Sequence, residues 1–470
     1  MHPLFRGSNH HSLGCLDGRV VVVSACALTL IGCVSAFPLP RGARLSAVLE
    51  PRGAVSVDRS DELGERLGGS DEIQASQPLT YDGAALAAVA LHPELRAARA
   101  QRGVGHAQIV QAGILPNPQA SGGLDIPTDG PTVGTSLPYS VELSWALSPL
   151  VSVGAAVDAE HRGLEAIELD IAWQEWQVAA GARLGVVRLF HLARRLEIAR
   201  QTEQTMTGQV ETLAAAVTAG NATVLELAAA QSTLQGASLA VLQLVQAQRA
   251  ARIEWLAALG LPPTADVQLA ADPAVPDHHE LPGLQALLAA LPDARLDLAG
   301  LRRAYDAQEG RARAAALGAF PAISVAIRRT SDTGQLGTVG FGVTVDLPFF
   351  DRNQGQIALE TATRDQLHEA YLARVQQARS EVARAHADLR SVREQRALVE
   401  GWLPTLEQLV DTSGQLVGGG NVSVVDLYDL RLRLLNVQLL AAELRQMEIE
   451  LTVALELASG VPWRSQEEAR

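Results

Sequence analysis

The strongest constraint on the fold is a long stretch without proline, between Pro149 and Pro262. The roughly 65 residues before Gly220 would form a rod of about 100 Å at 1.5 Å per residue. Helices average about 11–12 residues, so a helix of this length predicts coiled-coil packing against other helices. Apolar residues recur there at helical spacing among Glu, Gln and Arg: Leu164, Ile167, Ile171, Leu184, Val187, Leu192 and Leu196.

Turn signals divide the helical sequence into hairpins. Gly220-Asn221 and Gly418-Gly419-Gly420-Asn421 are typical of helix C-caps. Thr223 and Ser423 follow them and are suited to cap the returning helices. The sequence therefore predicts two long helical hairpins. Pro404 lies inside the second hairpin and has no partner in the first, so we expect a kink or a break there.

The chain repeats a series of landmarks at a spacing near 200 residues. Because the landmarks recur in one order, they predict duplication of a whole unit. Gly220-Asn221 returns as Gly420-Asn421, and Leu259-Gly260-Leu261-Pro262 returns as Ser459-Gly460-Val461-Pro462. Ser148-Pro149-Leu150 returns one residue out of step as Leu347-Pro348-Phe349, and Leu91-His92-Pro93 has a weaker echo in Ala290-Leu291-Pro292.

Each unit reads as a helix, two short strands, a very long helix, a turn and a long helix. The first helix is expected over about residues 80–113, and its counterpart over 293–317. Alternation with a period of two predicts strands at 139–147, 323–328 and 339–347, with a weaker candidate at 119–126. The predicted fold is therefore mainly α with a small β part.

The strands are about nine residues long, which is the length that crosses a bilayer at a strong tilt. Two amphipathic hairpins that cover a soluble core would show the same alternation. A spanning structure would have to be a closed β-barrel, and four strands cannot close one, so several chains would share it. In that case the alternation places Tyr139, Val141, Leu143 and Trp145 toward lipid and Ser140, Glu142 and Ser144 toward a lumen.

Composition and motifs argue against several function classes. Lysine is absent, aromatic residues make up 4% of the chain, and the net charge is −14, which disfavours nucleic acid as a partner. No G-x-S-x-G, P-loop or H-E-x-x-H pattern occurs, so we expect no enzyme activity, no cofactor and no metal site. His278-His279 lie in a connector that contains Pro and Asp, and we expect them to be solvated.

The N-terminal segment predicts export. Residues 20–31 are apolar and too short to span a bilayer, so they fit a signal-peptide core. The segment ends in Leu30-Ile31-Gly32-Cys33, which resembles the bacterial lipobox, whose cysteine is lipidated and becomes residue one. An ordinary signal peptide cut near Ala36 is the alternative. Val34 stands where Asp would retain a lipoprotein at the inner membrane.

Three segments resemble the TolC-like outer-membrane efflux family, and the resemblance covers about residues 80–463. Ala112-Gly113-Ile114-Leu115-Pro116-Asn117-Pro118 leads into the first strand. Leu347-Pro348-Phe349-Phe350-Asp351-Arg352-Asn353-Gln354-Gly355-Gln356-Ile357 follows the last strand. Residues 417–430 resemble the tip turn of the helical barrel. The first two segments are also similar to the branch that serves cobalt–zinc–cadmium exporters.

The resemblance implies a homotrimer in which a periplasmic α-helical barrel joins a shared 12-stranded transmembrane β-barrel. Such a protein is the outer-membrane channel of a tripartite efflux system, and it passively conducts what an inner-membrane pump expels, heavy-metal cations in the branch named above. Its partners would be a periplasmic adaptor (membrane fusion) protein, the pump and outer-membrane lipid. A periplasmic adaptor or a structural coiled-coil lipoprotein is the alternative, although an adaptor would need extensive β domains around a single hairpin.

These interpretations divide the chain into six parts. We expect a lipoprotein signal peptide at 1–32, a lipidated flexible linker at 33–77, and a first efflux repeat at 78–265. A connector at 266–292, a second efflux repeat at 293–463 and a C-terminal tail at 464–470 complete the chain.

The resemblance also implies roles for the hairpin tips. The carboxylates of Asp426 and Asp429, three residues apart on one helix face, would ring the closed periplasmic gate. The alternative is a solvated helix start, where Asp complements the helix dipole. The first unit has Glu226 but Ala229, so it repeats half of the pair. The tip residues expected to contact the adaptor are Gly220, Asn221, Thr223, Val224, Leu225, Gly420, Asn421, Ser423, Val424 and Val425.

Overall fold

The computed structural model describes residues 78–126, 128–129, 136–275, 281–417 and 423–461, all within one compact unit, Ser56–Arg470. A second unit, Met1–Val55, lies outside the described residues, and with it the predicted signal peptide and Cys33. The linker, the His278-His279 pair, Gly420, Asn421, Pro462 and the tail at 464–470 are also outside them.

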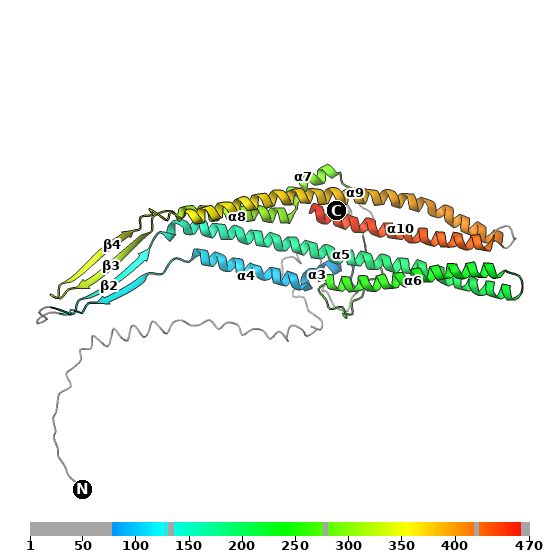
Figure 1. Cartoon of the computed structure of the whole chain (residues 1–470), viewed down its shortest axis with the longest axis horizontal. Helices are drawn as coiled ribbons and strands as arrows, with labels where there is room; N and C mark the ends of the chain where they lie inside the picture. The colour runs from blue at the N-terminus through cyan, green and yellow to red at the C-terminus, as the bar shows by residue number, and fades with distance from the viewer. Residues whose placement is uncertain (1–77, 127, 130–135, 276–280, 418–422, 462–470) are drawn as a thin grey trace, which may run out of the picture. The chain divides into compact units, whose positions relative to one another are not determined.

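The two halves of the unit share one order of elements, as the landmarks predict (Figure 1). The first half consists of α3 (Tyr81–Leu91), α4 (Pro93–Gly113), β1 (Gln119–Leu124), β2 (Tyr139–Ala146), α5 (Pro149–Thr218) and α6 (Val224–Ala258). The second half consists of α7 (Leu284–Ala294), α8 (Leu296–Leu317), β3 (Ile323–Ser331), β4 (Gly337–Val345), α9 (Gln354–Val417) and α10 (Val424–Ser459).

The first predicted helix of each half is in fact two helices. The chain becomes extended at His92 (ψ 123°) and at Arg295 (ψ 122°), which separates α3 from α4 and α7 from α8. Pro93 favours the first break, because proline has no N–H to donate and fits the first position of a helix. The echo expected at Ala290-Leu291-Pro292 is wrong by a few residues, since Pro292 lies inside α7. The second half also begins its helices earlier than expected, at Leu284.

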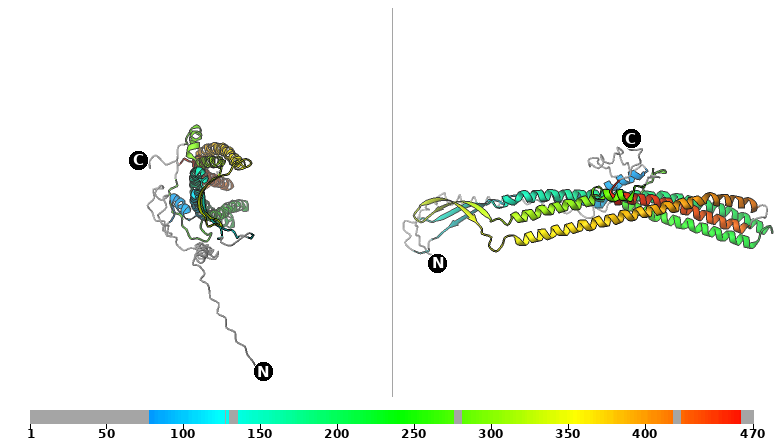
Figure 2. Two further views of the ribbon diagram at one scale, coloured as in Figure 1. Left: turned by 90° about the vertical axis from the view of Figure 1, so that its left-hand side faces the viewer. Right: turned by 90° about the horizontal axis from the view of Figure 1, so that it is seen from above.

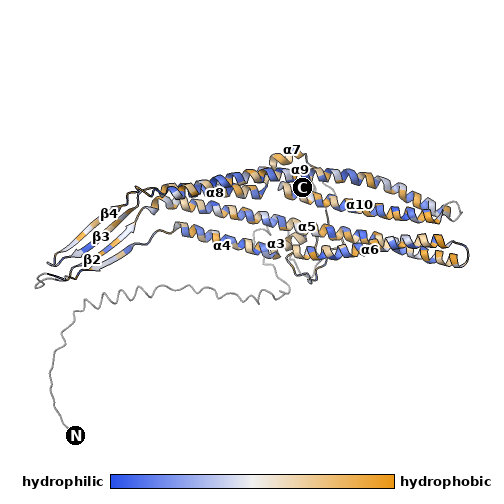
Figure 3. Cartoon of the chain, in the orientation of Figure 1, coloured by the Kyte–Doolittle hydropathy of each residue, from blue (hydrophilic) through white to orange (hydrophobic). Residues whose placement is uncertain are grey.

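The long helices are continuous. Helix α5 has 70 residues and α9 has 64, which correspond to about 105 and 96 Å. Helix α9 runs through Pro404, so a break there was the wrong alternative. Among the described helices, none combines the length and the apolar character needed to cross a membrane, and Figure 3 shows polar residues along each of them.

The four strands form one antiparallel sheet in the order β1-β2-β3-β4, so β1 and β4 are its edges. The register pairs Leu143 with Ile327 and Ile327 with Phe341, which collects apolar side chains on one face. The neighbouring pair, Glu142 and Arg328, lies on the other face with its charged groups 3.7 Å apart. The predicted alternation is therefore present in the sheet.

Helices α5 and α9 run through the whole helical layer. Helix α5 packs against α4 and α8 near the strands and against α6 and α10 farther away, while α9 packs against α8 and then α10. The sheet lies at one end of these helices and the turns of both hairpins at the other (Figure 2). The largest apolar cluster lies between these ends, where α3 and the C-terminal part of α6 cover α5.

Candidate functional site: the hairpin tips

The first tip, between α5 and α6, is closed by backbone hydrogen bonds. The N–H of Asn221 donates to the carbonyl of Ala216 (2.8 Å), and that of Gly220 donates to Val217 (3.0 Å). Gly220 has a positive φ of 76°, which completes a Schellman motif. The C-cap predicted at Gly220-Asn221 is therefore present, and the chain reverses within a few residues.

A reciprocal capping box begins α6. The N–H of Glu226 donates to Oγ1 of Thr223 (3.2 Å), and the N–H of Thr223 donates to the carboxylate of Glu226 (2.7 Å). Hydrogen bonds from the backbone and then the side chain of Thr223 hold the pKa of Glu226 below its ordinary value. The carboxylate of Glu226 therefore has a structural role in capping α6, which distinguishes it from Asp426, its counterpart in the second hairpin.

The second tip presents carboxylates on an exposed face. Ser423 caps α10 by accepting the N–H of Val425 (3.2 Å), as predicted. Asp426 and Asp429 are both exposed. Asp429 pairs with Arg433 at 2.8 Å, whereas no ion pair or side-chain hydrogen bond of Asp426 occurs within the described part of the chain.

The opposite face of α10 joins the two hairpins. Tyr428 is buried with Leu213 of α5 and Ala230 of α6. Burial raises the pKa of Tyr428, with Arg431 opposing the shift and Glu226 adding to it. Asp426 and Asp429 are exposed and lie outside the buried face that Tyr428 presents to the first hairpin. The structure therefore brings the two aspartates together on one exposed stripe of α10.

Apolar side chains at the first tip are also exposed. Val224 and Leu225 have 74% and 77% of their surface exposed, beside the exposed Thr223 and Asn221. Val424 and Val425, their counterparts at the second tip, are half-buried. Exposed apolar residues next to polar ones suit a protein interface. Among the described residues, no group of His, Cys, Asp or Glu is arranged to hold a metal ion.

Sequence reasoning missed a buried charge cluster in the second repeat, where it meets α5 of the first. The side chain of Arg295 is fully buried, pairs with Asp297 and Glu381 at 2.7 Å each, and lies over the Trp173 ring at 4.6 Å. Arg374 pairs with the same two carboxylates at 2.8 Å. Burial acts to raise the pKa of Asp297 and of Glu381, but hydrogen bonds and charges from the two arginines outweigh it and lower both. No local pattern separates Arg295 from the exposed arginines that follow it, so the sequence held no signal for this cluster.

Comparison with known proteins agrees with this architecture. Residues 287–461 match the family model described as outer membrane efflux protein. No curated protein sequence matches the chain.

Several solved structures share the fold. The structure of CusC, described by its formation of a transmembrane channel, has a TM-score of 0.66 and 19% identity, and the match covers 87% of this chain and all of that one. The outer-membrane channel OprN has a TM-score of 0.68 and 18% identity, with 88% and 98% of the two chains covered. The open state of the MtrE outer membrane channel of Neisseria gonorrhoeae has a TM-score of 0.65 and 17% identity, and the match covers 88% of this chain and 96% of that one.

Proposed function

We propose that this chain, whose residues 287–461 match the outer membrane efflux protein family, is a member of that family and the outer-membrane channel component of a tripartite efflux system. The observation that carries the proposal is the duplicated unit, which collects four strands at one end of the long helices and two hairpin tips at the other. The chain conducts solutes passively and catalyses no reaction. An adaptor or a structural coiled-coil lipoprotein is the weaker alternative, because neither needs two long hairpins joined to a two-faced sheet.

The channel is a homotrimer in this proposal. Among the described residues, the edge strands β1 and β4 each pair on one side only, so β4 of one copy can pair with β1 of the next. Three copies would then close a 12-stranded β-barrel. The apolar face around Val141, Leu143 and Phe341 would meet lipid, and the face with Glu142 and Arg328 would line the lumen. Exposures of 50% at Leu143 and 85% at Phe341 support this orientation.

The helices also carry exposed apolar side chains that would form a contact between neighbouring copies, here called the helical seam. Leu239 of α6 lies fifteen residues after Val224 at the tip, and Trp402 of α9 lies fifteen residues before Val417 at the tip. Both positions are therefore about 22 Å from the tips. Leu239 is 56% exposed and Trp402 is 48% exposed, on the two outer helices of the layer. We infer that α6 of one copy packs antiparallel to α9 of the next and covers both side chains.

The tips dock on a periplasmic adaptor that is attached to an inner-membrane pump. The exposed Val224 and Leu225 support this assignment for the first tip, together with Gly220, Asn221 and Thr223. The second tip would contribute Gly420, Asn421, Ser423, Val424 and Val425. Asp426 and Asp429 from each copy would form the gate that narrows the periplasmic entrance. Such a ring of carboxylates would attract cations and repel anions.

Lipid at Cys33 would add an anchor to the outer membrane. A single acyl chain binds a membrane only marginally, so stable attachment needs more than one, as in bacterial lipoproteins. Heavy-metal cations are the proposed cargo, on the resemblance of residues 112–118 and 347–357 to the cobalt–zinc–cadmium branch. Cys33→Ser should abolish incorporation of labelled fatty acid, and unchanged labelling would exclude the anchor.

The central experiment is reconstitution of the purified chain in planar bilayers. We expect discrete channel openings and a heat-modifiable trimer band on gels. A monomeric chain that gives no conductance would overturn the channel assignment and favour the adaptor or coiled-coil alternative.

A further inference from the structure

A pocket with a volume of about 650 Å³ lies among α5, α8 and α9, close to the sheet. Small-molecule sites typically have volumes of about 300–1,000 Å³. One wall is apolar and includes Val151 and Leu317, which lie within two helical turns of β2 and β3. The rest of the lining is charged: Asp158, Arg162, Glu309, Arg313 and Arg364.

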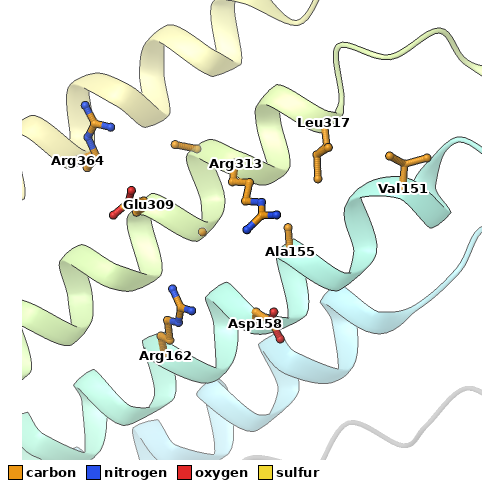
Figure 4. Close-up of a pocket in the computed structure, with 10 residues that line it drawn as sticks. Val151, Ala155, Asp158, Arg162, Glu309, Arg313, Leu317 and Arg364 are labelled. Atoms are coloured by element: carbon orange, nitrogen blue, oxygen red, sulfur yellow. The ribbon is translucent and has the colours of Figure 1, made fainter.

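Arg364 pairs with Asp365 at 3.0 Å, whereas the other charged groups of this pocket make few polar contacts among the described residues. Figure 4 shows Arg162 of α5 and Arg313 of α8 both extending into the space between their helices, with Asp158 on α5 nearby. Within the described part of the chain, neither Arg313 nor Asp158 makes an ion pair or a side-chain hydrogen bond. Arg162 only donates to the backbone carbonyl of Asp306, at 3.4 Å. Two guanidiniums are therefore available to one anion, with a carboxylate beside them.

The pocket opens on the outer side of the proposed channel. Asp158 and Arg183 are twenty-five residues apart on α5, which is about seven turns, so they share one face of the helix. Arg183 pairs with Asp82 of α3 at 2.6 Å and lies over the ring of Tyr81. Helix α3 is thus a second layer on this face. A second layer fits on the outside of a channel, because on the inside it would fill the lumen.

Exposed apolar side chains lie between the pocket and the sheet. They occur where the strands meet the helices, which is where an apolar band would meet the headgroup layer of a membrane. A ligand in the pocket would therefore have its polar end at the arginines and its apolar end toward the sheet. These side chains are Ile114, Leu150, Phe320, Leu347, Phe349 and Phe350, with exposures from 44% to 94%.

We propose that this pocket binds the headgroup of a membrane phospholipid that carries both a phosphate diester and a primary ammonium group. The phosphate lies between Arg162 and Arg313, the ammonium group lies at Asp158, and the acyl chains extend past Val151 and Leu317 toward the apolar face of the sheet. The inference rests on the proposed function, because it needs the sheet to lie in a membrane.

Native mass spectrometry of the full chain in detergent tests the proposal, with phosphatidylethanolamine, phosphatidylglycerol and phosphatidylcholine as probes. We expect preferential retention of phosphatidylethanolamine, because phosphatidylglycerol lacks the ammonium group and the methylated headgroup of phosphatidylcholine cannot donate hydrogen bonds. Replacing both arginines, Arg162→Gln with Arg313→Gln, should weaken that binding about tenfold or more, the effect of losing one charged hydrogen bond. Asp158→Asn should weaken phosphatidylethanolamine binding and leave phosphatidylglycerol binding unchanged.

Arg384→Gln is the matched control, because Arg384 is 86% exposed on α9 and lies outside the pocket. Equal lipid retention by the double variant and the parent would overturn the proposal. A preference for phosphatidylglycerol would also overturn it, and so would displacement of the lipid by millimolar inorganic phosphate, which would indicate a free-anion site. A chain that conducts but retains no lipid contradicts this inference alone, whereas a chain that retains lipid but never conducts contradicts the proposed function.

Discussion

Gly260 touches His92 so closely that no side chain fits between them. A Cβ atom on Gly260 would lie 2.7 Å from the Cα atom of His92 and 2.8 Å from Cδ of Pro93. The second half repeats the contact, since a Cβ on Gly460 would lie 2.8 Å from the carbonyl oxygen of Ala294 and 3.1 Å from Cα of Arg295. In each half, the glycine after the second hairpin helix packs into the break between the first two helices.

Gly260→Ala should destabilise the protein strongly. Gly260 has a φ of 70°, which costs other residues about 1–2 kcal/mol, and overpacking against a backbone that cannot rotate away adds about 1–3 kcal/mol. Gly220→Ala is the matched control, because Gly220 has a φ of 76° but open space around it. The midpoint of heat denaturation, followed by circular dichroism, measures both. Equal losses for the two variants would mean that the contact with His92 does not matter.

These contacts explain what the sequence could and could not predict. The landmark Gly260 was visible because glycine at a helix end is a local signal. The break at Arg295, against which Gly460 packs, was not visible, because it has no proline and depends on burial and tertiary ion pairs. The strands were visible from their period of two, and the tip caps from Thr223 and Ser423. One face of α10 joins the hairpins and another stays exposed. Packing around Tyr428 decides which face is which, and no local sequence pattern predicts that packing.

Asp297→Asn should destabilise the protein by roughly 3–5 kcal/mol, the usual cost of removing one partner of a buried ion pair. The reason is that Arg295 is fully buried and would keep its charge with a single carboxylate, Glu381. Asp388→Asn is the control, because Asp388 pairs with Arg384 on an exposed face and should contribute no more than about 1 kcal/mol. Similar denaturation midpoints for the two variants would contradict the structural role of the cluster.

The same cluster predicts an acid-dependent loss of stability. The pKa values of Asp297 and Glu381 are lowered in the folded protein. Their contribution is therefore complete above the unfolded values, about 4, and disappears as the pH falls through the folded values. Heat denaturation measured from pH 7 down to pH 3 should show this decline. The decline should be smaller in Asp297→Asn, and an identical pH profile in parent and variant would contradict it.

A charge on the apolar face of the sheet should impair membrane insertion. Leu143→Arg should cost about 2–4 kcal/mol near the middle of the bilayer, because Leu143 lies on the face with Ile327. Ser144→Arg is the control on the other face, where it pairs with Ala326, and should cost far less. Position 142 is a poorer control, because an arginine there would oppose Arg328. Folding into vesicles followed by heat-modifiable mobility measures the effect, and equal damage at both positions would refute the register.

A charge in the helical seam should weaken the trimer. Trp402→Glu and Leu239→Glu each place a carboxylate against an apolar partner in the neighbouring copy, and together they place two like charges opposite each other. Leu239→Arg combined with Trp402→Glu should restore the trimer that Trp402→Glu alone loses. Cross-linking and gel mobility report the assembly. Failure of the charge-reversed pair to rescue would mean that α6 and α9 do not meet at this register.

Neutralising the carboxylates of the second tip tests the gate. Asp426→Asn with Asp429→Asn removes two charges from each of three chains at one constriction, and should raise conductance and weaken block by divalent cations from the periplasmic side. The control is Glu226→Gln, because glutamine keeps the capping box with Thr223 while removing the charge. If Asp426 and Asp429 only complement the helix dipole, the double variant loses a little stability and conducts like the parent. The double variant also removes the partner of Arg433, so a single variant is needed to separate the two effects. Asp426→Asn alone leaves the Asp429–Arg433 pair intact. It should reproduce part of the conductance change if charge at the entrance is the cause.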